Sequence, residues 1–404
     1  GAAGCLETAT GCQSPPSRVA RVKAKRRVPR MFYDYVDCGS WTEGTYRANS
    51  LDLERIQFRQ RVGLDISRRS LSTTMLGEMV SMPVALAPTG LTGMQHADGE
   101  ILAARAAEAF GVPFTLSSMS ICSIEDVAQN TTKPFWFQLY VIKDRAFIER
   151  LVERARVAGC SALVLTLDLQ VQGQRHKDIK NGLSTPPRLT LSNLLNLASK
   201  PRWCLGMLGT KRHGFGNLVG HVKGISDVRS LAGWVVEQFD QTLSWEDVRW
   251  LRMLWDRKLV LKGIMTPEDA ETAASVGADA IIVSNHGGRQ LDGACSTVDA
   301  LPEIASKVGD RLEVFADSGV RSGQDVLRML ASGAKAVFIG RSFLYGLGAL
   351  GENGVRLCLD IIRKELDLTM ALCGVTDIEK VDRSILADRP CEGGKRSVAS
   401  PTRA

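Results

Sequence analysis

The sequence lacks the features that mark several large classes of protein. No apolar run approaches the ~18 residues of a membrane-spanning helix, so the chain is not expected to cross a bilayer. The 10 cysteines show neither a CxxC spacing nor clustering with the 5 histidines, which predicts reduced, mostly structural thiols of an intracellular protein and no metal site. Zinc-finger, homeodomain and RNA-recognition signatures are also missing, and we expect no binding to nucleic acid.

Positive charge is concentrated in two segments of a chain whose formal net charge is +7. Residues 17–30 carry seven Lys or Arg and no acid, and residues 173–224 carry nine against the single acid Asp178. Two interpretations stay open for such segments: a solvated surface, or a surface that contacts anionic lipid.

Short apolar runs alternate with helical patterns from Met82 onward, which predicts an α/β fold. The 404 residues, 44% hydrophobic and 24% charged, admit one large domain. Eight strands are predicted, at residues 83–87, 113–116, 135–139, 162–167, 258–262, 280–283, 313–316 and 336–339. The helices between them include residues 98–110, 145–158, 267–276 and 323–331. Strict alternation predicts a parallel sheet, and eight strands predict closure into a (β/α)8 TIM barrel, with a long insertion at about 173–240 after strand four.

Residues that bind phosphate in other barrels follow the last two predicted strands. Gly319 and Arg321 follow strand seven, and Gly340 and Arg341 follow strand eight. Barrel enzymes commonly bind phosphate there, so a phosphorylated cofactor is expected. The glycine string at 346–351 fits a dinucleotide template but lies inside a helical stretch, so we interpret it as a chance match.

The nine residues 284–292, Ser-Asn-His-Gly-Gly-Arg-Gln-Leu-Asp, directly follow strand six. His286 can move a proton near neutral pH, and Arg289 can bind a carboxylate. This nonapeptide resembles the signature of the FMN-dependent α-hydroxy-acid dehydrogenases and oxidases, among them glycolate oxidase and mandelate dehydrogenase. Over residues 29–386 the chain is most similar to the bacterial membrane-associated L-lactate dehydrogenases.

The resemblance implies a set of site residues and FMN as the cofactor. The implied FMN contacts are Pro88, Thr89, Gly90, Ser117, Gln138, Thr166, Lys262, Ser284, Asp317, Gly319, Arg321, Gly340 and Arg341. The implied substrate-binding residues are Tyr35, Tyr140, Arg175, His286 and Arg289. The implied catalytic residues are His286, Asp168, Tyr140 and Arg289, with Asp168 paired to the histidine.

The chemistry of these residue types fits the oxidation of a hydroxy acid. Arg175 and Arg289 can orient a carboxylate, His286 can take a proton, and Asp168 can hold the resulting imidazolium. The resemblance implies oxidation of an L-2-hydroxy acid, L-lactate to pyruvate foremost, with electrons passed to a quinone or cytochrome. An oxidase that forms hydrogen peroxide is the alternative. A catalytically inactive flavin barrel and an isomerase remain further readings, although an isomerase has no use for two carboxylate-binding arginines.

Three segments outside the barrel remain open to interpretation. Residues 1–28 are predicted to be disordered or a mitochondrial targeting segment, although the periodic Val19, Val22 and Val28 also suit a first helix. Residues 387–404 are predicted to be a disordered tail. Residues 181–221 combine leucines, Trp203 and basic residues, which suits either a helix at a membrane surface or a cap on the barrel. By resemblance, we expect a homotetramer or larger homo-oligomer, peripheral on the cytoplasmic face of the inner membrane if bacterial.

Overall fold

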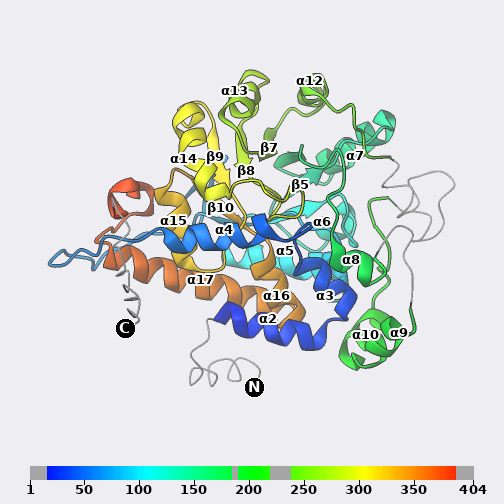
Figure 1. Ribbon diagram of the computed structural model, residues 1–404. Helices are drawn as coiled ribbons and strands as arrows, with labels where there is room; N and C mark the ends of the chain where they lie inside the picture. Colours follow the sequence, from blue (N-terminus) through cyan, green and yellow to red (C-terminus); the bar gives the residue numbers. More distant parts are fainter. Residues whose placement is uncertain (1–15, 184–189, 219–237, 388–404) are drawn as a thin grey trace, which may run out of the picture.

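The computed structural model describes residues 16–183, 190–218 and 238–387, and a parallel barrel lies at their centre (Figure 1). Neighbouring strands follow the order β3-β10-β9-β8-β7-β6-β5-β4, and every pair is parallel. The N–H of Leu86 donates to the carbonyl of Pro113 at 2.9 Å, which closes the barrel between β3 and β4. The predicted (β/α)8 fold is confirmed. Its strands are β3 (Val84–Leu86), β4 (Thr115–Ser117), β5 (Trp136–Leu139), β6 (Ala162–Thr166), β7 (Lys258–Ile264), β8 (Ala280–Val283), β9 (Glu313–Ala316) and β10 (Ala336–Ile339).

Alternate strand residues fill the inside of the barrel, because successive side chains of a strand point to opposite faces. Trp136, Phe315 and Phe338 meet there with ring centroids between 5.8 and 6.2 Å apart. A hairpin of β1 (Thr73–Met75) and β2 (Glu78–Val80) adds side chains to the same buried cluster. This hairpin closes the amino-terminal end of the barrel and leaves the carboxyl end for the site.

Helices surround the barrel (Figure 1). Most bury one face against it, whereas α16 is buried on almost every side. In α7 the buried residues are Phe147, Ile148, Leu151, Val152 and Ala155, the spacing of a single helix face. The predicted helix at 98–110 begins at Gly99 instead, because Asp98 adopts a left-handed conformation with φ 56°. The surrounding helices are α4 (Gly44–Arg55), α5 (Gly99–Phe110), α6 (Ile124–Ala128), α7 (Arg145–Val157), α12 (Trp245–Leu254), α13 (Pro267–Ser275), α14 (Thr297–Val308), α15 (Gly323–Ala331), α16 (Arg341–Leu350) and α17 (Glu352–Leu372).

The glycine string at 346–351 serves helix packing. It lies mainly inside α16, as expected for a chance match to the dinucleotide template. A Cβ atom on Gly346 would lie 2.4 Å from the carbonyl oxygen of Gly354 in α17, and one on Gly348 would lie 2.8 Å from Cγ2 of Val28. Glycine at both positions therefore lets neighbouring backbones approach closely.

The amino-terminal segment is helical where it is described, so the expectation of disorder through residue 28 is wrong from residue 16 onward. Helix α2 (Pro16–Arg27) runs alongside α16, and Ala24 and Val28 are buried there (Figure 1). The alternative of a first helix is what the structure shows. Residues 1–15 and the predicted tail at 388–404 lie outside the described residues.

The insertion after β6 forms α8 (His176–Lys180), α9 (Leu191–Ala198) and α10 (Pro201–Gly209), while 184–189 and 219–237 lie outside the described residues. Leucines on α9 and α10 face outward, as a membrane-surface helix requires. Trp203 does not join them: its ring stacks on Phe32 with centroids 5.6 Å apart, and its Nε1 donates to the carbonyl of Met94. Trp203 therefore anchors α10 to the barrel. Within the described ranges, none of the helices has the length and hydropathy of a bilayer-spanning segment.

Candidate active site at the carboxyl end of the barrel

Polar side chains continue the inward-facing rows of the strands at the open end of the barrel. Each stands two positions after a residue of the barrel interior and therefore points to the same side. Lys262 is only 4% exposed there, so its charge is held inside the barrel mouth. The residues that continue these rows in β5, β6, β7, β8 and β9 are Gln138, Thr166, Lys262, Ser284 and Asp317.

A histidine and an aspartate meet across the barrel mouth. Nδ1 of His286, after β8, lies 2.8 Å from Oδ1 of Asp168, after β6. Burial opposes ionisation of Asp168, but the charge and hydrogen bond of His286, together with Lys262, lower the pKa of the carboxyl group. Burial lowers the pKa of His286, and Lys262 and Arg289 add to this against the raising effect of Asp168. Both pKa values are lowered from their ordinary values, so at neutral pH the pair is a carboxylate and a neutral imidazole, the state in which His286 can accept a proton.

The backbone makes room for this pair with unusual conformations. His286 has φ 58°, and Gly287 and Gly288 follow with φ 68° and 71°. Three successive left-handed residues turn the loop sharply, and the glycines allow it. Gly263, with φ 102°, supplies the space for the aspartate, since a Cβ atom at this position would lie 2.8 Å from Cβ of Asp168.

Arg175 and Arg289 lie beside Tyr35 and form what we call the two-arginine corner. The guanidinium of Arg289 lies 4.7 Å from the ring centroid of Tyr35, and that of Arg175 lies 5.5 Å from it. Nε of Arg175 donates to Oδ2 of the buried Asp178 at 2.6 Å. Asp178 thus orients Arg175, and the two guanidinium groups can bind one carboxylate between them.

Hydrogen bonds and an ion pair link these polar groups in a row from β4 to the end of β9. The hydroxyl of Ser117 donates to Oε1 of Gln138 at 2.9 Å, and Nε2 of Gln138 donates to Oγ1 of Thr166 at 3.1 Å. Lys262 donates to Oγ of Ser284 at 2.7 Å and pairs with Asp317 at 3.1 Å. Such a row can hydrogen-bond the edge of a planar, polar ring.

A cationic corner lies at the ends of β9 and β10. Arg341 stacks 4.7 Å from the ring centroid of Tyr46. Burial, followed by repulsion from Arg321 and Arg289, lowers the pKa of Arg341. No carboxylate pairs with any of these three guanidinium groups in the part of the chain that the structure describes. An anion of the size and charge of a phosphate would offset their repulsion.

A cavity of about 380 Å³ joins the three groups of residues. The predicted residues that line it are Tyr35, Thr89, Gly90, Ser117, Tyr140, Arg175, Lys262, His286, Arg289, Asp317, Gly319, Arg321, Gly340 and Arg341. Four other predicted residues lie behind this lining. Asp168, Gln138 and Ser284 each form a hydrogen bond with a lining residue, and Thr166 forms one with Gln138. Pro88 stands beside the lining residue Thr89. Their chemical roles stay predictions.

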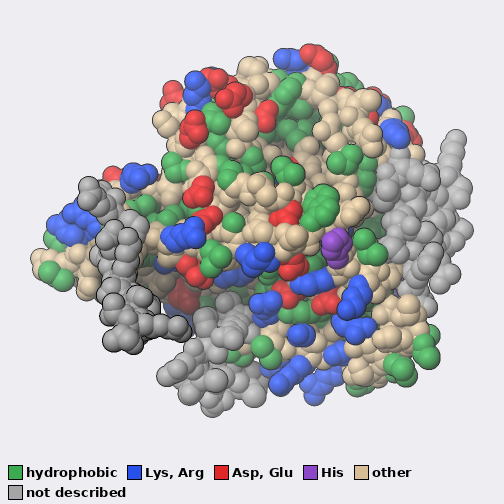
Figure 2. All heavy atoms as spheres, viewed as in Figure 1, with side chains coloured by type: hydrophobic (Ala, Val, Ile, Leu, Met, Phe, Trp, Pro, Cys, Tyr) green, Lys and Arg blue, Asp and Glu red, His purple; other side chains and the backbone are tan. Residues whose placement is uncertain are grey.

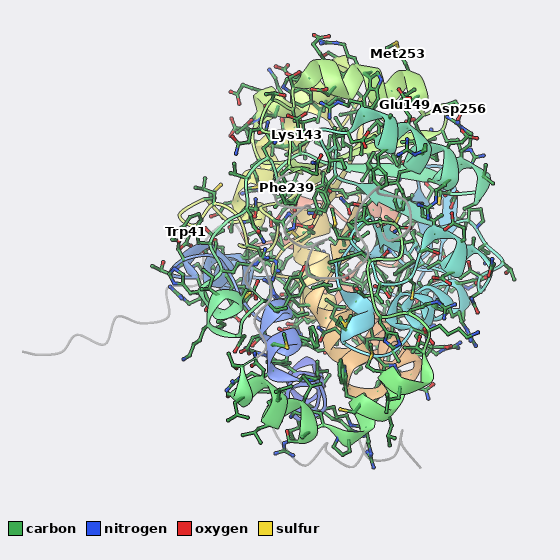
Figure 3. The ribbon with its side chains drawn as sticks, turned by 90° about the vertical axis from the view of Figure 1, so that its right-hand side faces the viewer. Trp41, Lys143, Glu149, Phe239, Met253 and Asp256 are labelled. Atoms are coloured by element: carbon green, nitrogen blue, oxygen red, sulfur yellow. The ribbon has the colours of Figure 1, made fainter. Side chains whose placement is uncertain are left out.

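Several residues at the cavity were not predicted. Phe239, from the end of the insertion, meets Tyr140 edge-on at 6.2 Å and lies inward of the exposed Trp41 in Figure 3. Burial raises the pKa of the Tyr140 phenol well above its usual range. Asp178 stands three residues after Arg175, a helical spacing that could have suggested the ion pair. The apolar wall of Met31, Phe32, Leu91, Met94 and Leu344 carried no signal in the sequence.

Comparison with known proteins identifies the family. A family model described as FMN-dependent dehydrogenase matches residues 24–388. The chain belongs to the FMN-dependent dehydrogenase family. Among its relatives, L-lactate dehydrogenase of Caulobacter vibrioides (strain NA1000 / CB15N) is 48% identical over 93% of this chain and 98% of that protein. L-lactate dehydrogenase of Pseudomonas syringae pv. syringae (strain B728a) is 47% identical over 91% and 96%.

Solved structures of this family share the fold closely. The crystal structure of the monotopic membrane protein (S)-mandelate dehydrogenase is 38% identical, with a TM-score of 0.88 over 92% of this chain and 99% of that one. A mandelate oxidase variant bound to (S)-mandelic acid is 33% identical, with a TM-score of 0.76 over 90% and 95%.

The cavity residues fit the FMN cofactor of this family. Gly319 has φ 88°, and a Cβ atom there would lie 2.3 Å from the carbonyl oxygen of Asn49, so only glycine brings the backbone this close. Gly340 and Arg341 stand at the amino-terminal end of α16, where free N–H groups favour phosphate. With guanidinium groups that no carboxylate of the described residues neutralises, and with the ring-edge row, the site offers donors for both ends of FMN.

Proposed function

We propose that the protein oxidises an L-2-hydroxy acid, L-lactate foremost, to the 2-oxo acid with FMN as its cofactor. The observation that carries this proposal is the neutral His286, paired with Asp168, in one cavity with Arg175 and Arg289. A base beside a two-arginine corner suits a substrate that has both a carboxylate and a proton to lose. The similarity to L-lactate and mandelate enzymes supports this substrate class.

The side chains divide the work of the reaction. Arg175 and Arg289 bind the substrate carboxylate, with the hydroxyl of Tyr35 beside them, and so fix the orientation of the α-carbon. Nε2 of His286 takes a proton from the substrate, and Asp168 stabilises the imidazolium and keeps the ring in the required tautomer. The phenol of Tyr140 is neutral, as the raised pKa ensures, and can donate a hydrogen bond to the substrate.

Bound FMN supplies the two-electron acceptor in this scheme. Its phosphate would be held by Gly319, Arg321, Gly340 and Arg341. Its ring edge would face Ser117, Gln138 and Thr166, and Pro88, Thr89 and Gly90 would contact the ring itself. Lys262, Ser284 and Asp317 complete the set; the ammonium group of Lys262 favours negative charge nearby.

The exposed face of α9 and α10 supports contact with a membrane and a lipid-soluble electron acceptor. Leu191, Leu194, Leu195, Leu205 and Leu208 are between 51% and 82% exposed there. Basic side chains gather around α2 beside this corner (Figure 2). Apolar side chains next to cations suit the surface of an anionic leaflet. We therefore propose a peripheral membrane enzyme that delivers electrons to a quinone or cytochrome; a homotetramer and a cytoplasmic-face location remain predictions.

Anaerobic mixing of the purified FMN-loaded protein with a panel of 2-hydroxy acids tests the proposed function. L-Lactate or a close L-2-hydroxy acid should bleach the flavin, and the bleached protein should then be reoxidised faster by a quinone analogue than by oxygen. A flavin that no member of the panel bleaches would overturn the proposal. Rapid reoxidation by oxygen with formation of peroxide would instead make the protein an oxidase.

A further inference from the structure

The last turn of α3 (Arg30–Val36) and the residues after it contact Arg289 of the two-arginine corner and Arg341 of the cationic corner. We call residues 35–38 the α3 turn. Nη1 of Arg289 lies 2.5 Å from the carbonyl oxygen of Tyr35 and 3.4 Å from that of Cys38. Nη2 of Arg341 lies 2.7 Å from the same carbonyl oxygen of Cys38. Carbonyl groups at the end of a helix carry partial negative charge, so they favour these cations.

Further contacts tie the same turn to Arg341 and to Lys177. Nε of Arg341 donates to the carbonyl of Val36 at 2.8 Å, and Nζ of Lys177 donates to that of Asp37 at 3.1 Å. All four carbonyl groups of the α3 turn therefore accept a hydrogen bond from a cation. A shift of this turn would move Arg289 and Arg341 together.

The carboxylate of Asp37 ties the α3 turn to neighbouring helices. It is buried, and it accepts hydrogen bonds from the hydroxyl of Tyr345 in α16 at 2.5 Å and that of Tyr33 in α3 at 3.3 Å. Nη2 of Arg21 in α2 completes the set at 2.8 Å. Three helices therefore meet at one side chain. The carboxylate of Asp37 itself contacts neither Arg289 of the two-arginine corner nor Arg341 of the cationic corner.

We propose that Asp37 is a positioning residue that holds Arg289 for the substrate carboxylate and Arg341 for the cofactor phosphate through the α3 turn. The identity of the two ligands rests on the proposed function. Because Arg21 lies on α2, the amino-terminal helix is part of the support of the site.

Substitutions of the carboxylate and its partners test this proposal. Asp37→Asn removes the charge, Arg21→Gln removes the ion pair, and Tyr345→Phe removes one hydrogen bond while keeping the ring. Asp34→Asn is the matched control, because Asp34 lies on the same helix and accepts a hydrogen bond from Asn181 without touching the α3 turn. For each variant the dissociation constant of FMN, KM and kcat for the hydroxy acid, and the melting temperature are measured.

Asp37→Asn and Arg21→Gln should raise both the FMN dissociation constant and KM, by about 10-fold for Asp37→Asn, with kcat within about two-fold of the wild type. Tyr345→Phe should shift both constants in the same direction by less, and Asp34→Asn should change neither. A lower melting temperature with both constants unchanged would overturn the proposal, as would a rise in only one constant. If no hydroxy acid bleaches the wild-type flavin, the proposed function fails, while an unchanged FMN constant in Asp37→Asn overturns the positioning role independently.

Discussion

Nδ1 of His286 lies 2.8 Å from Oδ1 of Asp168, although 118 positions separate the two residues in the chain. The barrel brings them together, because the strands before them, β8 and β6, both end at its carboxyl edge. The other carboxylate oxygen, Oδ2 of Asp168, has no hydrogen-bond partner among the described residues. The histidine is therefore the principal partner of this carboxylate.

Replacing the base should slow the reaction without loss of the cofactor. His286→Gln removes the proton acceptor but keeps a side chain of similar size, so we expect bound FMN and a rate of flavin bleaching lowered by about 10²- to 10⁴-fold. Stopped-flow absorbance under anaerobic conditions measures this rate. Near-normal bleaching in the FMN-loaded variant would show that another group takes the proton.

The rate should fall on the acid side of neutrality. The active form of His286 is neutral, and its pKa lies below the usual value, so kcat/KM should fall only as pH drops through that lowered pKa. Asp168 raises the pKa of His286, and Asp168→Asn should therefore move this acid limb to still lower pH while kcat decreases. A limb that moves to higher pH in Asp168→Asn would contradict the electrostatic assignment.

Arginine should be required at position 289, in the two-arginine corner, for binding of the substrate carboxylate. Arg289→Lys keeps the charge but loses the planar pair of donors, and a hydrogen bond to a charged group contributes about 1.5–3 kcal/mol. We expect KM for L-lactate to rise by about 10- to 100-fold. Arg249→Lys, at an exposed ion pair with Glu246 on α12, is the control and should leave KM unchanged. Equal KM values in both variants would remove Arg289 from substrate binding.

Gly263 should be needed for activity beyond its contribution to stability. Gly263→Ala would place a methyl group 2.8 Å from Cβ of Asp168 and push the carboxylate away from His286, lowering kcat by up to about 100-fold. Gly277→Ala is the matched control, since Gly277 also has a positive φ, 81°, but its nearest neighbour is Cδ of Arg252 at 3.7 Å. The control should be destabilised with normal kcat. Equal kcat in the two variants would show that only backbone strain matters at Gly263.

The leucines of α10 should govern association with membranes. Leu205 and Leu208 are 69% and 82% exposed, and Leu368 and Leu372 on α17 are 61% and 59% exposed. Leu205→Ser with Leu208→Ser should lower co-sedimentation with anionic vesicles by about 10-fold or more, because each buried leucine contributes about 1.5–3 kcal/mol. The same pair of changes at Leu368 and Leu372 should have no effect. Equal loss with both pairs would contradict a docking face on α9 and α10.

The sequence supports the barrel better than it supports the contacts between its elements. Strands β8, β9 and β10 have the predicted bounds, because short apolar runs between glycine-rich turns leave little choice. Strand β7 extends two residues beyond its prediction, to Ile264, because a register shift at Gly263 lets the strand continue past Lys262. Such a shift depends on the neighbouring strand and leaves no local pattern.

The contacts that the sequence did not predict share one physical origin. Asp37 meets Tyr345 across 308 positions, and Trp203 meets Met94 across 109. Both contacts arise from packing of helices outside the barrel, which no periodicity records. The same limit explains why the sequence did not show that Arg21, one of the basic residues of α2, binds Asp37.

The most direct test is an anaerobic titration of the FMN-loaded protein with L-lactate, with flavin absorbance and the released 2-oxo acid measured together. We expect one equivalent of L-lactate to bleach one flavin and yield one pyruvate. We expect His286→Gln to lose this reaction on the same time scale, while its flavin is still bleached by dithionite. An unbleached wild-type flavin with L-lactate and with every other L-2-hydroxy acid, despite full FMN occupancy, would contradict the account.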